Sequence, residues 1–363
     1  MKSLTIIGGG LAGLSLGCAL LQRKLPVAIY ESGEYPRHRV CGEYIRGVEP
    51  ATLKALGIER EFADAATLAD LQCFWRDRPF LRKSLRNRAW GLSRYMLDER
   101  LCRRFTSLGG DLYTNQRIES GNGSSSSYVH NSAQSEGILW ACGRRKQKSQ
   151  WLGLKMHVQH MPLHRDLELH LGDHAYVGIC PIEHGRINVC GLFSKRPSIR
   201  ARKPDLFIRY LEQCGLGKLA ERLQAAEPDP ISYAAVSGFS CERAPKSMEA
   251  ASIGDHYSMI PPFTGNGMSM AFESAAMAVQ PIMQWANGDA SWEQANRQLQ
   301  RKIHRHFRNR LALARWAHRY FYHPKYQPLF YVAAKTRMLP FQLLTNWTQG
   351  GTATWKIPKK VSG

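Results

Sequence analysis

The residues with the clearest potential for chemistry are the glycines at 8–13, which read GGGLAG. They follow a short apolar run and precede residues 11–23, in which apolar residues recur at helical spacing. A G-x-G-x-x-G pattern between a strand and a helix is typical of dinucleotide binding: Gly8 permits the tight turn, Gly10 lets the backbone approach a pyrophosphate, and Gly13 allows close packing. The N–H groups at the helix N-terminus would face the phosphates.

A carboxylate follows the second predicted strand, at the position where a dinucleotide-binding site has one. Residues 27–30 read as a second strand, and Glu31 follows it, 18 residues beyond Gly13. At this position a carboxylate can accept hydrogen bonds from an adenosine ribose. The alternative is a glycine-rich buried helix start that binds no ligand. The combination of loop and acid favours the dinucleotide interpretation.

A second segment far along the chain has related features. Residues 252–272 read SIGDHYSMIPPFTGNGMSMAF, in which a short strand ends at Gly-Asp, two prolines stiffen a loop, and Gly265 and Gly267 open a helix. Asp255 could hold a polyol hydroxyl. The backbone N–H groups of residues 265–268 could face the electron-rich edge of a ring system.

These segments, in this order, resemble the FAD-binding motifs of the para-hydroxybenzoate hydroxylase and geranylgeranyl reductase superfamily. The resemblance covers residues 1–290 and implies FAD as the cofactor. The motifs, with the segments at 37–42 and 94 considered below, assign cofactor contacts to Gly8, Gly10, Ala12, Gly13, Glu31, Arg37, Arg39, Cys41, Gly42, Arg94, Asp255, Pro262, Gly265, Asn266, Gly267 and Met268.

Two further positions bear on this resemblance. Residues 91–94 read GLSR, and the family has an arginine here that contacts FAD above the pyrophosphate; the alternative for Arg94 is a pair with Asp98 that caps a surface helix. The family also carries an Asp-Gly pair after a strand, whereas this chain has Cys142-Gly143. Because that motif is associated with nicotinamide use, NAD(P)H stays open as the electron donor, and a separate protein donor is the alternative.

The segment at 36–46, PRHRVCGEYIR, resembles the reductase-like branch, in which R/K-x-C-G runs toward the flavin ring. The resemblance implies that Arg37 or Arg39 pairs with the pyrophosphate and that Cys41 lies near the isoalloxazine, where a thiol could donate a proton. A buried cysteine is more often inert. The strand NVCGLF at 188–193 points to the same branch, and no Trp-x-Trp-x-Ile-Pro segment of the flavin halogenases occurs.

Composition limits the remaining possibilities. The nine cysteines form no C-x-x-C and no zinc spacing, which predicts a reduced, intracellular protein without a metal site. The apolar run from Leu4 to Leu21 contains too many glycines for a signal peptide, and no window is long enough to span a membrane. We therefore expect a cytoplasmic protein, with peripheral attachment to the inner face of the membrane as an additional option.

The net charge of +21 is concentrated at the C-terminal end, where residues 294–363 contain fourteen Lys and Arg and no acid. Residues 293–321 read as a long helix, with Ile303, Phe307 and Leu311 four residues apart. One interpretation is a packed helix with a solvated basic face. Another is attachment to an anionic membrane, with Trp316 and the aromatics at 320–322 at the interface. Nucleic-acid binding is disfavoured because no recognition motif accompanies the charge.

The expected fold is α/β, with a Rossmann-like, three-layer FAD-binding domain, an inserted, mostly antiparallel β substrate domain, and a basic helical tail. The FAD domain is assigned to 1–66, 94–155 and 245–296, the substrate domain to 67–93 and 156–244, and the tail to 297–363. Helices are expected over 51–66, 95–108, 205–226 and 267–287, and strands within 71–93 and 156–195, at 138–143 and at 250–253.

The expected function is FAD-dependent oxidoreduction of a hydrophobic organic or lipid substrate. The first candidate is reduction of a carbon–carbon double bond by hydride from reduced flavin, and the runner-up is hydroxylation of an aromatic ring with oxygen activated on the flavin. A candidate of another class is a non-catalytic flavoprotein or a basic scaffold for membrane or nucleic acid. Side chains considered for the substrate pocket are Trp75, Phe80, Tyr176, Cys180 and Phe193.

Overall fold

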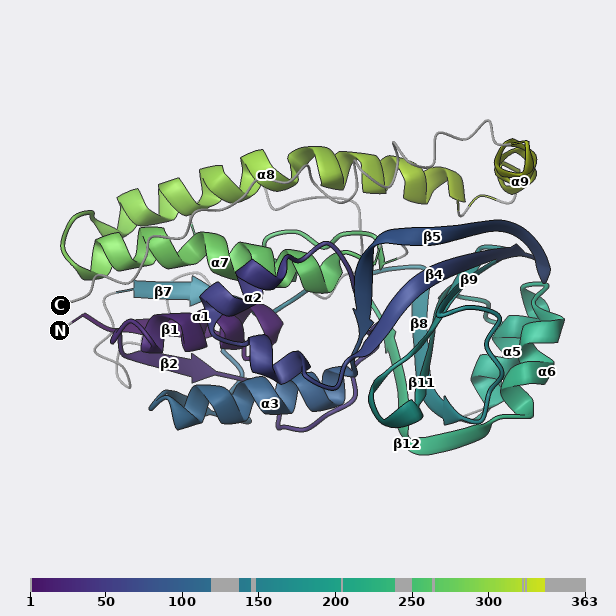
Figure 1. The fold of residues 1–363 in the computed structure, drawn as a ribbon, viewed down its shortest axis with the longest axis horizontal. Coiled ribbons are helices and arrows are strands. Elements are labelled where there is room, and N and C mark those ends of the chain that lie inside the picture. The colour runs from purple at the N-terminus through teal and green to yellow at the C-terminus, as the bar shows by residue number, and fades with distance from the viewer. Residues whose placement is uncertain are drawn as a thin grey trace.

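A four-stranded parallel sheet forms around the N-terminal strand (Figure 1). The computed structural model describes residues 2–118, 137–144, 148–203, 205–238, 250–262, 265–321, 323 and 325–336. The strands lie in the order β6-β2-β1-β7, with β1 spanning Leu4–Ile7, β2 Val27–Tyr30, β6 Asp111–Tyr113 and β7 Gly137–Trp140. The expected β-α-β unit is present, since β1 and β2 pair in parallel and α1 (Leu11–Leu21) connects them in the chain.

Helix α1 is the centre of the first core. Ten of its eleven residues are buried, and it packs against α3 (Arg94–Ser107) and α7 (Gly267–Ala286). The contact with α3 is close because Gly17 has no side chain, and a Cβ there would lie 2.6 Å from the Phe105 ring. A short α2 (Pro50–Leu56) and the 3-10 turn η1 (Glu59–Phe62) complete this layer.

The second sheet has eight strands, in the order β12-β8-β11-β10-β9-β4-β5-β3. Its pairings are antiparallel except for β4 with β9. The strands are β3 (Tyr44–Ile45), β4 (Ala66–Trp75), β5 (Arg78–Gly91), β8 (Trp151–Gln159), β9 (Leu167–Gly172), β10 (Ala175–Pro181), β11 (Ile187–Ser194) and β12 (Glu227–Ser237), with the 3-10 turn η2 (Glu183–Gly185) between β10 and β11. The α/β fold class is therefore confirmed.

The two faces of this sheet differ in chemistry. On one face Leu154, Val158 and Val189 are buried in a core shared with α5 (Asp205–Gln213) and α6 (Gly217–Gln224). On the other face the alternating residues Lys155 and His157 of β8 lie toward the segment that follows β2. Because side chains alternate along a strand, one strand serves both an apolar core and a polar seam between the two sheets.

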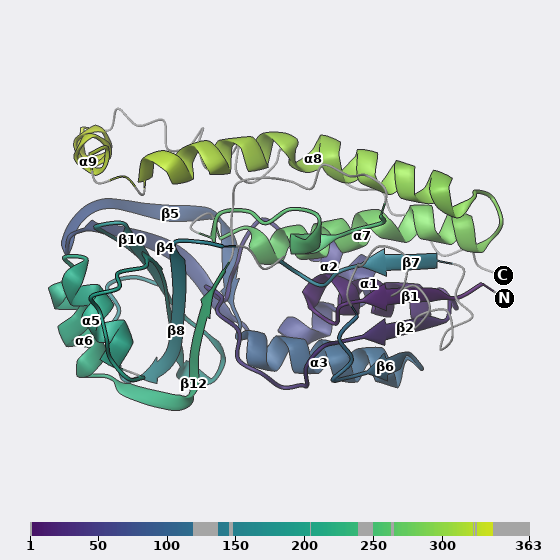
Figure 2. The same cartoon turned by 180° about the vertical axis from the view of Figure 1, so that it is seen from behind.

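A long helix lies along the outside of the first domain. Helix α8 (Trp292–Phe321) packs against α7, on the side away from the parallel sheet (Figures 1 and 2). The three apolar residues expected to share one face, Ile303, Phe307 and Leu311, are all buried. Helix α9 (Gln327–Lys335) follows and contacts β5 of the second sheet.

Some elements differ from the sequence-based expectation. Residues 51–66 form α2 and η1 instead of one helix, and residues 205–226 are interrupted where Gly215 adopts a φ of +75°. Residues 250–253 contribute a single bridge, between Ser252 and Trp140, instead of a strand. Helix α9 lies within residues 297–363, which were assigned to a basic helical tail. The exact domain boundaries stay a prediction, as does the tail beyond residue 336, which lies outside the described residues.

Candidate functional site

The turn after β1 has the geometry that the glycine pattern predicts. Gly8 has a φ of +112°, and a Cβ on it would lie 2.5 Å from the carbonyl group of Ala141. A Cβ on Gly13 would lie 2.1 Å from the Gly8 oxygen, so helix and turn are in direct contact. By contrast, the Cβ position of Gly10 has no atom within 4 Å, and Gly10 caps α1 without a side-chain hydrogen bond. The N-terminus of α1 is therefore open to a ligand, as phosphate binding requires.

Glu31 is buried directly beside this turn. Its carboxylate accepts hydrogen bonds from the Gly9 amide at 2.9 Å and the Gly33 amide at 3.1 Å, and it pairs with Arg37 at 2.6 Å. Burial by itself would raise the pKa of Glu31, but the charges of Arg37 and Arg39 outweigh it and lower the pKa. The acid is thus ionised, and Arg37 already occupies one of its oxygens.

Two arginines from different segments share one buried carboxylate. Asp98 accepts from Arg94 at 2.7 and 2.8 Å and from Arg39 at 3.0 Å. Arg94 therefore makes the Arg/Asp pair considered in the sequence, and Arg39 joins it. Among the described residues, the buried atoms Nη2 of Arg39 and Nε of Arg37 have no hydrogen-bond partner. Unused guanidinium donors beside an open helix N-terminus suit an anionic ligand.

The Gly-Asp segment approaches the same turn from the other end of the chain. Gly254, in η3 (Gly254–His256), has a φ of +60°, and a Cβ on it would lie 3.0 Å from the Cβ of Ala12. Asp255 follows Gly254 and is exposed to solvent. Asp255 and the turn after β1 therefore belong to one site.

The start of α7 lies next to the segment at 36–46. Gly265 has a φ of +66°, and a Cβ there would lie 2.5 Å from the Tyr44 ring. The Sγ of Cys41 lies 3.6 Å from the Sδ of Met268. Asn266 caps α7 and is buried, while Gly267 is half-buried and Pro262 is exposed. Residues 263–264 of this loop lie outside the described residues.

Residues 41–42 lie over the inner face of the second sheet. Asn188 donates to the Cys41 carbonyl at 3.1 Å, and Cys180 donates to the Gly42 carbonyl at 3.4 Å. The next rung of the same face pairs Gly178 with Cys190, and the Cβ position of Gly178, like that of Gly42, has no atom within 4 Å. The Cβ positions of Gly42 and Gly178 therefore each face open space. Burial raises the pKa of Cys41, so its thiol is protonated at neutral pH.

A buried charged network supports this segment, and sequence reasoning did not identify it. Glu43 is fully buried and has a φ of +51°, a conformation that side-chain-bearing residues rarely adopt. Its carboxylate lies 3.2 Å from Nζ of Lys155 and 2.6 Å from Nε2 of His157, and it accepts from the Arg94 amide at 2.9 Å. Nζ of Lys155 also lies 3.2 Å from Nδ1 of His38.

The electrostatics of the network are those of an ion pair with a neutral neighbour. Burial by itself would raise the pKa of Glu43, but Lys155 and His157 lower it, so the carboxylate is charged. Burial and the nearby Lys155 lower the pKa of His38 to about 4. The available signal was the alternation of Lys155 and His157 in an otherwise apolar strand, but their partner lies more than a hundred residues away in the chain.

Cys142 and the residues considered for the substrate pocket lie in different parts of the structure. Cys142 is exposed at the end of β7, its Sγ lies 3.2 Å from the Ile7 carbonyl, and desolvation raises its pKa to about 11. Tyr176 and Trp75 belong to an apolar cluster on the inner face of the sheet. Phe193 instead packs in the opposite core against Phe207, because it occupies the alternate face of β11.

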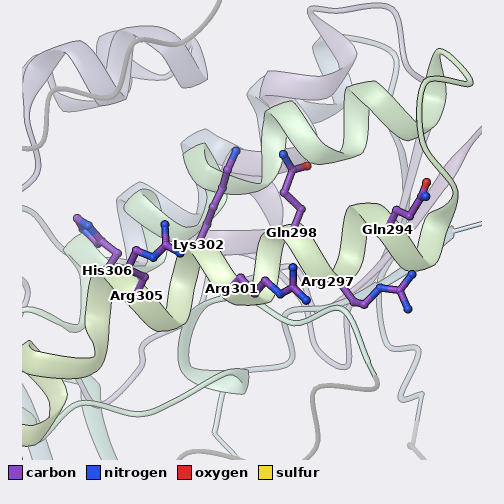
Figure 3. A pocket seen from close by; sticks show the side chains of 7 residues that line it. All are labelled: Gln294, Arg297, Gln298, Arg301, Lys302, Arg305 and His306. Atoms are coloured by element: carbon purple, nitrogen blue, oxygen red, sulfur yellow. The ribbon is translucent and has the colours of Figure 1, made fainter.

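Two hollows among the described residues lie outside this site. One, of about 710 Å³, runs along α8 (Figure 3), and the other, of about 770 Å³, lies beside β4 and α6. In the part of the chain that the structure describes, no group of His, Cys, Asp or Glu side chains could hold a metal ion. Among the described helices, none has the length and hydrophobicity of a transmembrane span.

Comparison with solved structures places the fold, although neither a protein-family model nor the sequence of a curated protein matches the chain. The chain is similar to the flavin-dependent brominase Bmp2 (15% identity, TM-score 0.73, 96% of this chain and 93% of the other). It is similar to a Klebsiella pneumoniae HpxO variant complexed with FAD (18% identity, TM-score 0.73, 96% of this chain and 99% of the other). A third similar structure is that of PqsL, a probable FAD-dependent monooxygenase from Pseudomonas aeruginosa (12% identity, TM-score 0.67, 91% of this chain and 99% of the other). The chain therefore shares its fold with flavin-dependent monooxygenases and halogenases.

Proposed function

We propose that this protein binds FAD and uses it to oxidise a hydrophobic organic substrate. The observation that carries the proposal is the convergence of three distant segments: the open turn at Gly10, the arginines around Glu31 and Asp98, and the start of α7 beside Cys41. The structural neighbours include monooxygenases, which supports oxygen-dependent chemistry over the reductase reaction that the sequence put first.

Each half of the cofactor has residues suited to it. The amides at the start of α1, with Arg37 and Arg39, would hold the pyrophosphate, and Glu31 would hold the adenosine ribose. Asp255 would accept from the polyol chain, and the N-terminus of α7 would face the pyrimidine edge of the ring. Bound there, FAD would supply electron transfer and oxygen activation, which amino-acid side chains alone do not provide.

The chain would contribute orientation and exclusion of water. The apolar side chains of Leu171, Tyr176 and Leu192 on the inner face of the sheet would hold an apolar substrate. The Cβ positions of Gly42 and Gly178 have no atom within 4 Å, which would leave room for the substrate there. The network around Glu43 would hold that segment in its strained conformation.

Reduction of a carbon–carbon double bond is the second candidate. Its support is Cys41, a half-buried thiol that stays protonated because burial raises its pKa, so that it has a proton to donate. For this candidate, Cys41→Ala should bind FAD as the parent does but lose turnover of a polyunsaturated lipid. Unchanged turnover would eliminate the thiol as the proton donor.

The source of electrons follows from the residue at 142. A thiol with a raised pKa is neutral at pH 7 and cannot replace a carboxylate in hydrogen bonding to a nicotinamide cofactor. We infer that NAD(P)H reduces this flavin slowly and that a separate protein donor serves it. Stopped-flow reduction by NADPH at a rate typical of turnover would contradict this inference.

The first test is flavin binding followed by reaction with oxygen. FAD is titrated into the purified protein, reduced chemically without air, and mixed with oxygen in a stopped-flow spectrometer. A transient absorbance distinct from both oxidised and reduced flavin supports monooxygenation. Slow reoxidation without a transient supports the reductase candidate. A protein that neither contains nor binds flavin would refute the proposal and favour a non-catalytic scaffold.

A further inference from the structure

Helix α8 presents a row of basic side chains on the side away from α7. Arg297, Arg301, Arg305 and Arg308 are exposed and follow one another at intervals of four, four and three residues, which places them on one helical face. The opposite face is buried through Ile303, Phe307 and Leu311.

The basic row borders the hollow of about 710 Å³ described above, which is lined by Gln294, Arg297, Gln298, Arg301, Lys302, Arg305 and His306. Figure 3 shows Lys302 pointing to the neighbouring helix, where it donates to Gln280 at 2.8 Å. His306 is held by Glu273 at 2.7 Å. No described carboxylate forms an ion pair with Arg297, Arg301 or Arg305, so their charges remain available to an external anion.

Exposed apolar side chains gather near the C-terminal end of this row. Six large hydrophobic side chains of the described residues are strongly exposed, and four of them lie between 316 and 332: Trp316, Tyr326, Leu329 and Val332. Leu329 and Val332 are three residues apart on α9, while Gln327 is buried and donates to the Gly172 carbonyl. Leu329 and Val332 therefore form a small exposed apolar patch on α9.

Helices α8 and α9 lie on the same long edge of the molecule. Helix α8 runs along the domain that contains the parallel sheet, and α9 covers the end of β5 (Figures 1 and 2). A solvated basic face would explain the arginines but not the exposed aliphatic side chains of α9, which cost free energy in water. A purely acidic protein partner would likewise leave Leu329 and Val332 without a role.

We propose that α8 and α9 bind this protein to an anionic lipid surface. Arg297, Arg301 and Arg305 would lie against the headgroups, and Leu329 and Val332 would enter the boundary between headgroups and acyl chains. This attachment is independent of flavin chemistry, so it can be tested whether or not FAD binds.

The test is co-sedimentation of the full chain with vesicles of phosphatidylcholine alone or with one-third phosphatidylglycerol. The triple variant Arg297→Gln/Arg301→Gln/Arg305→Gln should lose affinity for the anionic vesicles by roughly 100-fold, at about fivefold per basic residue. Its matched control, Arg200→Gln/Arg202→Gln/Lys203→Gln, removes the same charge from exposed residues before α5 and should bind normally.

The apolar contribution is tested separately. Leu329→Ser/Val332→Ser should weaken binding at least tenfold, whereas Ile231→Ser, which changes an exposed residue of β12, should not. Equal binding to neutral and anionic vesicles would overturn the proposal, and so would an equal loss in the control triple. Loss in the arginine triple with full binding by Leu329→Ser/Val332→Ser would mean a purely electrostatic site and would also overturn it. Thermal unfolding of every variant excludes misfolding as the cause.

Discussion

At the scale of single residues, Glu43 has two energetically unfavourable features that are rarely found together. It is a fully buried charge, and it has a positive φ without being glycine. Breaking a buried ion pair by removing one partner typically costs about 3–5 kcal/mol because the remaining charge is uncompensated. A residue held in this way at the seam between two sheets is a candidate for positioning the segment at 41–43.

Glu43→Gln keeps the shape of the side chain and removes its charge. We expect it to destabilise the protein by about 3 kcal/mol and to weaken FAD binding at least tenfold, because Lys155 is left charged beneath Gly42. The control is Glu168→Gln, since Glu168 is also fully buried and pairs with Arg222 and His170 away from the seam. Urea unfolding and FAD titration give the two quantities. Equal FAD affinity in the two variants would show that Glu43 has only a structural role.

Two histidines contribute to the pH dependence of stability. Burial lowers the pKa of His38 and of His318 from 6.5 to about 4. Between pH 6.5 and 4 these histidines bind protons in the unfolded chain but not in the folded chain. The free energy of unfolding therefore falls as the pH drops from 6.5 to 4. Urea unfolding at pH 7 and pH 5 measures this loss. His38→Gln should reduce the loss, and an unchanged slope would mean that His38 titrates normally.

At the scale of elements, the glycines of the first turn serve different purposes. Gly8 and Gly13 are required by close backbone contacts, whereas Gly10 faces open space. The same distinction applies to α7, where Gly265 accommodates the Tyr44 ring. A pattern of glycines therefore mixes positions needed by the fold with positions kept clear for a ligand.

A pair of substitutions separates these purposes. Gly8→Ala should destabilise the protein by more than about 2 kcal/mol, because its φ is +112° and its Cβ would meet the backbone at Ala141. Gly10→Ala, at a φ of −86°, should unfold like the parent but bind FAD at least tenfold more weakly. Thermal unfolding and flavin fluorescence measure the two effects. Normal FAD affinity in Gly10→Ala would place the pyrophosphate elsewhere.

At the scale of the whole molecule, the candidate site belongs to no single stretch of chain. Helix α8 fixes the Gly-Asp segment from outside, since Gln300 donates to the Ser252 carbonyl at 3.1 Å and Arg315 to the Ser258 hydroxyl at 3.1 Å. The second sheet fixes residues 41–43 from the other side. A ligand that joins these parts should stabilise the entire protein.

We therefore expect FAD to raise the melting temperature. At 100 times its dissociation constant, a ligand that binds only the folded state contributes about 2.7 kcal/mol, or roughly 3–4 °C for a chain of this size. FMN at the same concentration should give less than half of that shift, because it has no adenosine to contact Glu31. Equal shifts with both flavins would mean that the turn after β1 does not take part in binding.

The parts of the fold that depend on local sequence could be predicted. The strand, glycine turn and helix at the N-terminus follow from neighbouring residues, and the four-residue spacing of Ile303, Phe307 and Leu311 correctly predicted the buried face of α8. Boundaries were less certain where one residue changes the conformation, as Gly215 does by dividing α5 from α6. Residues 250–253 were wrongly expected to form a strand, because a single bridge to Trp140 depends on a partner distant in the chain.

By itself, the sequence determined the α/β class, the glycine turn with its acid, and the concentration of positive charge near the C-terminus. Each depends on short-range sterics or on composition. Only the tertiary structure decided which charges meet: Arg39 with Asp98, and Glu43 with Lys155 and His157. Each pair forms only when folding brings distant segments together around a buried carboxylate, and no local pattern encodes that contact. The polar seam beneath Cys41 and Gly42 is therefore a property of the folded chain.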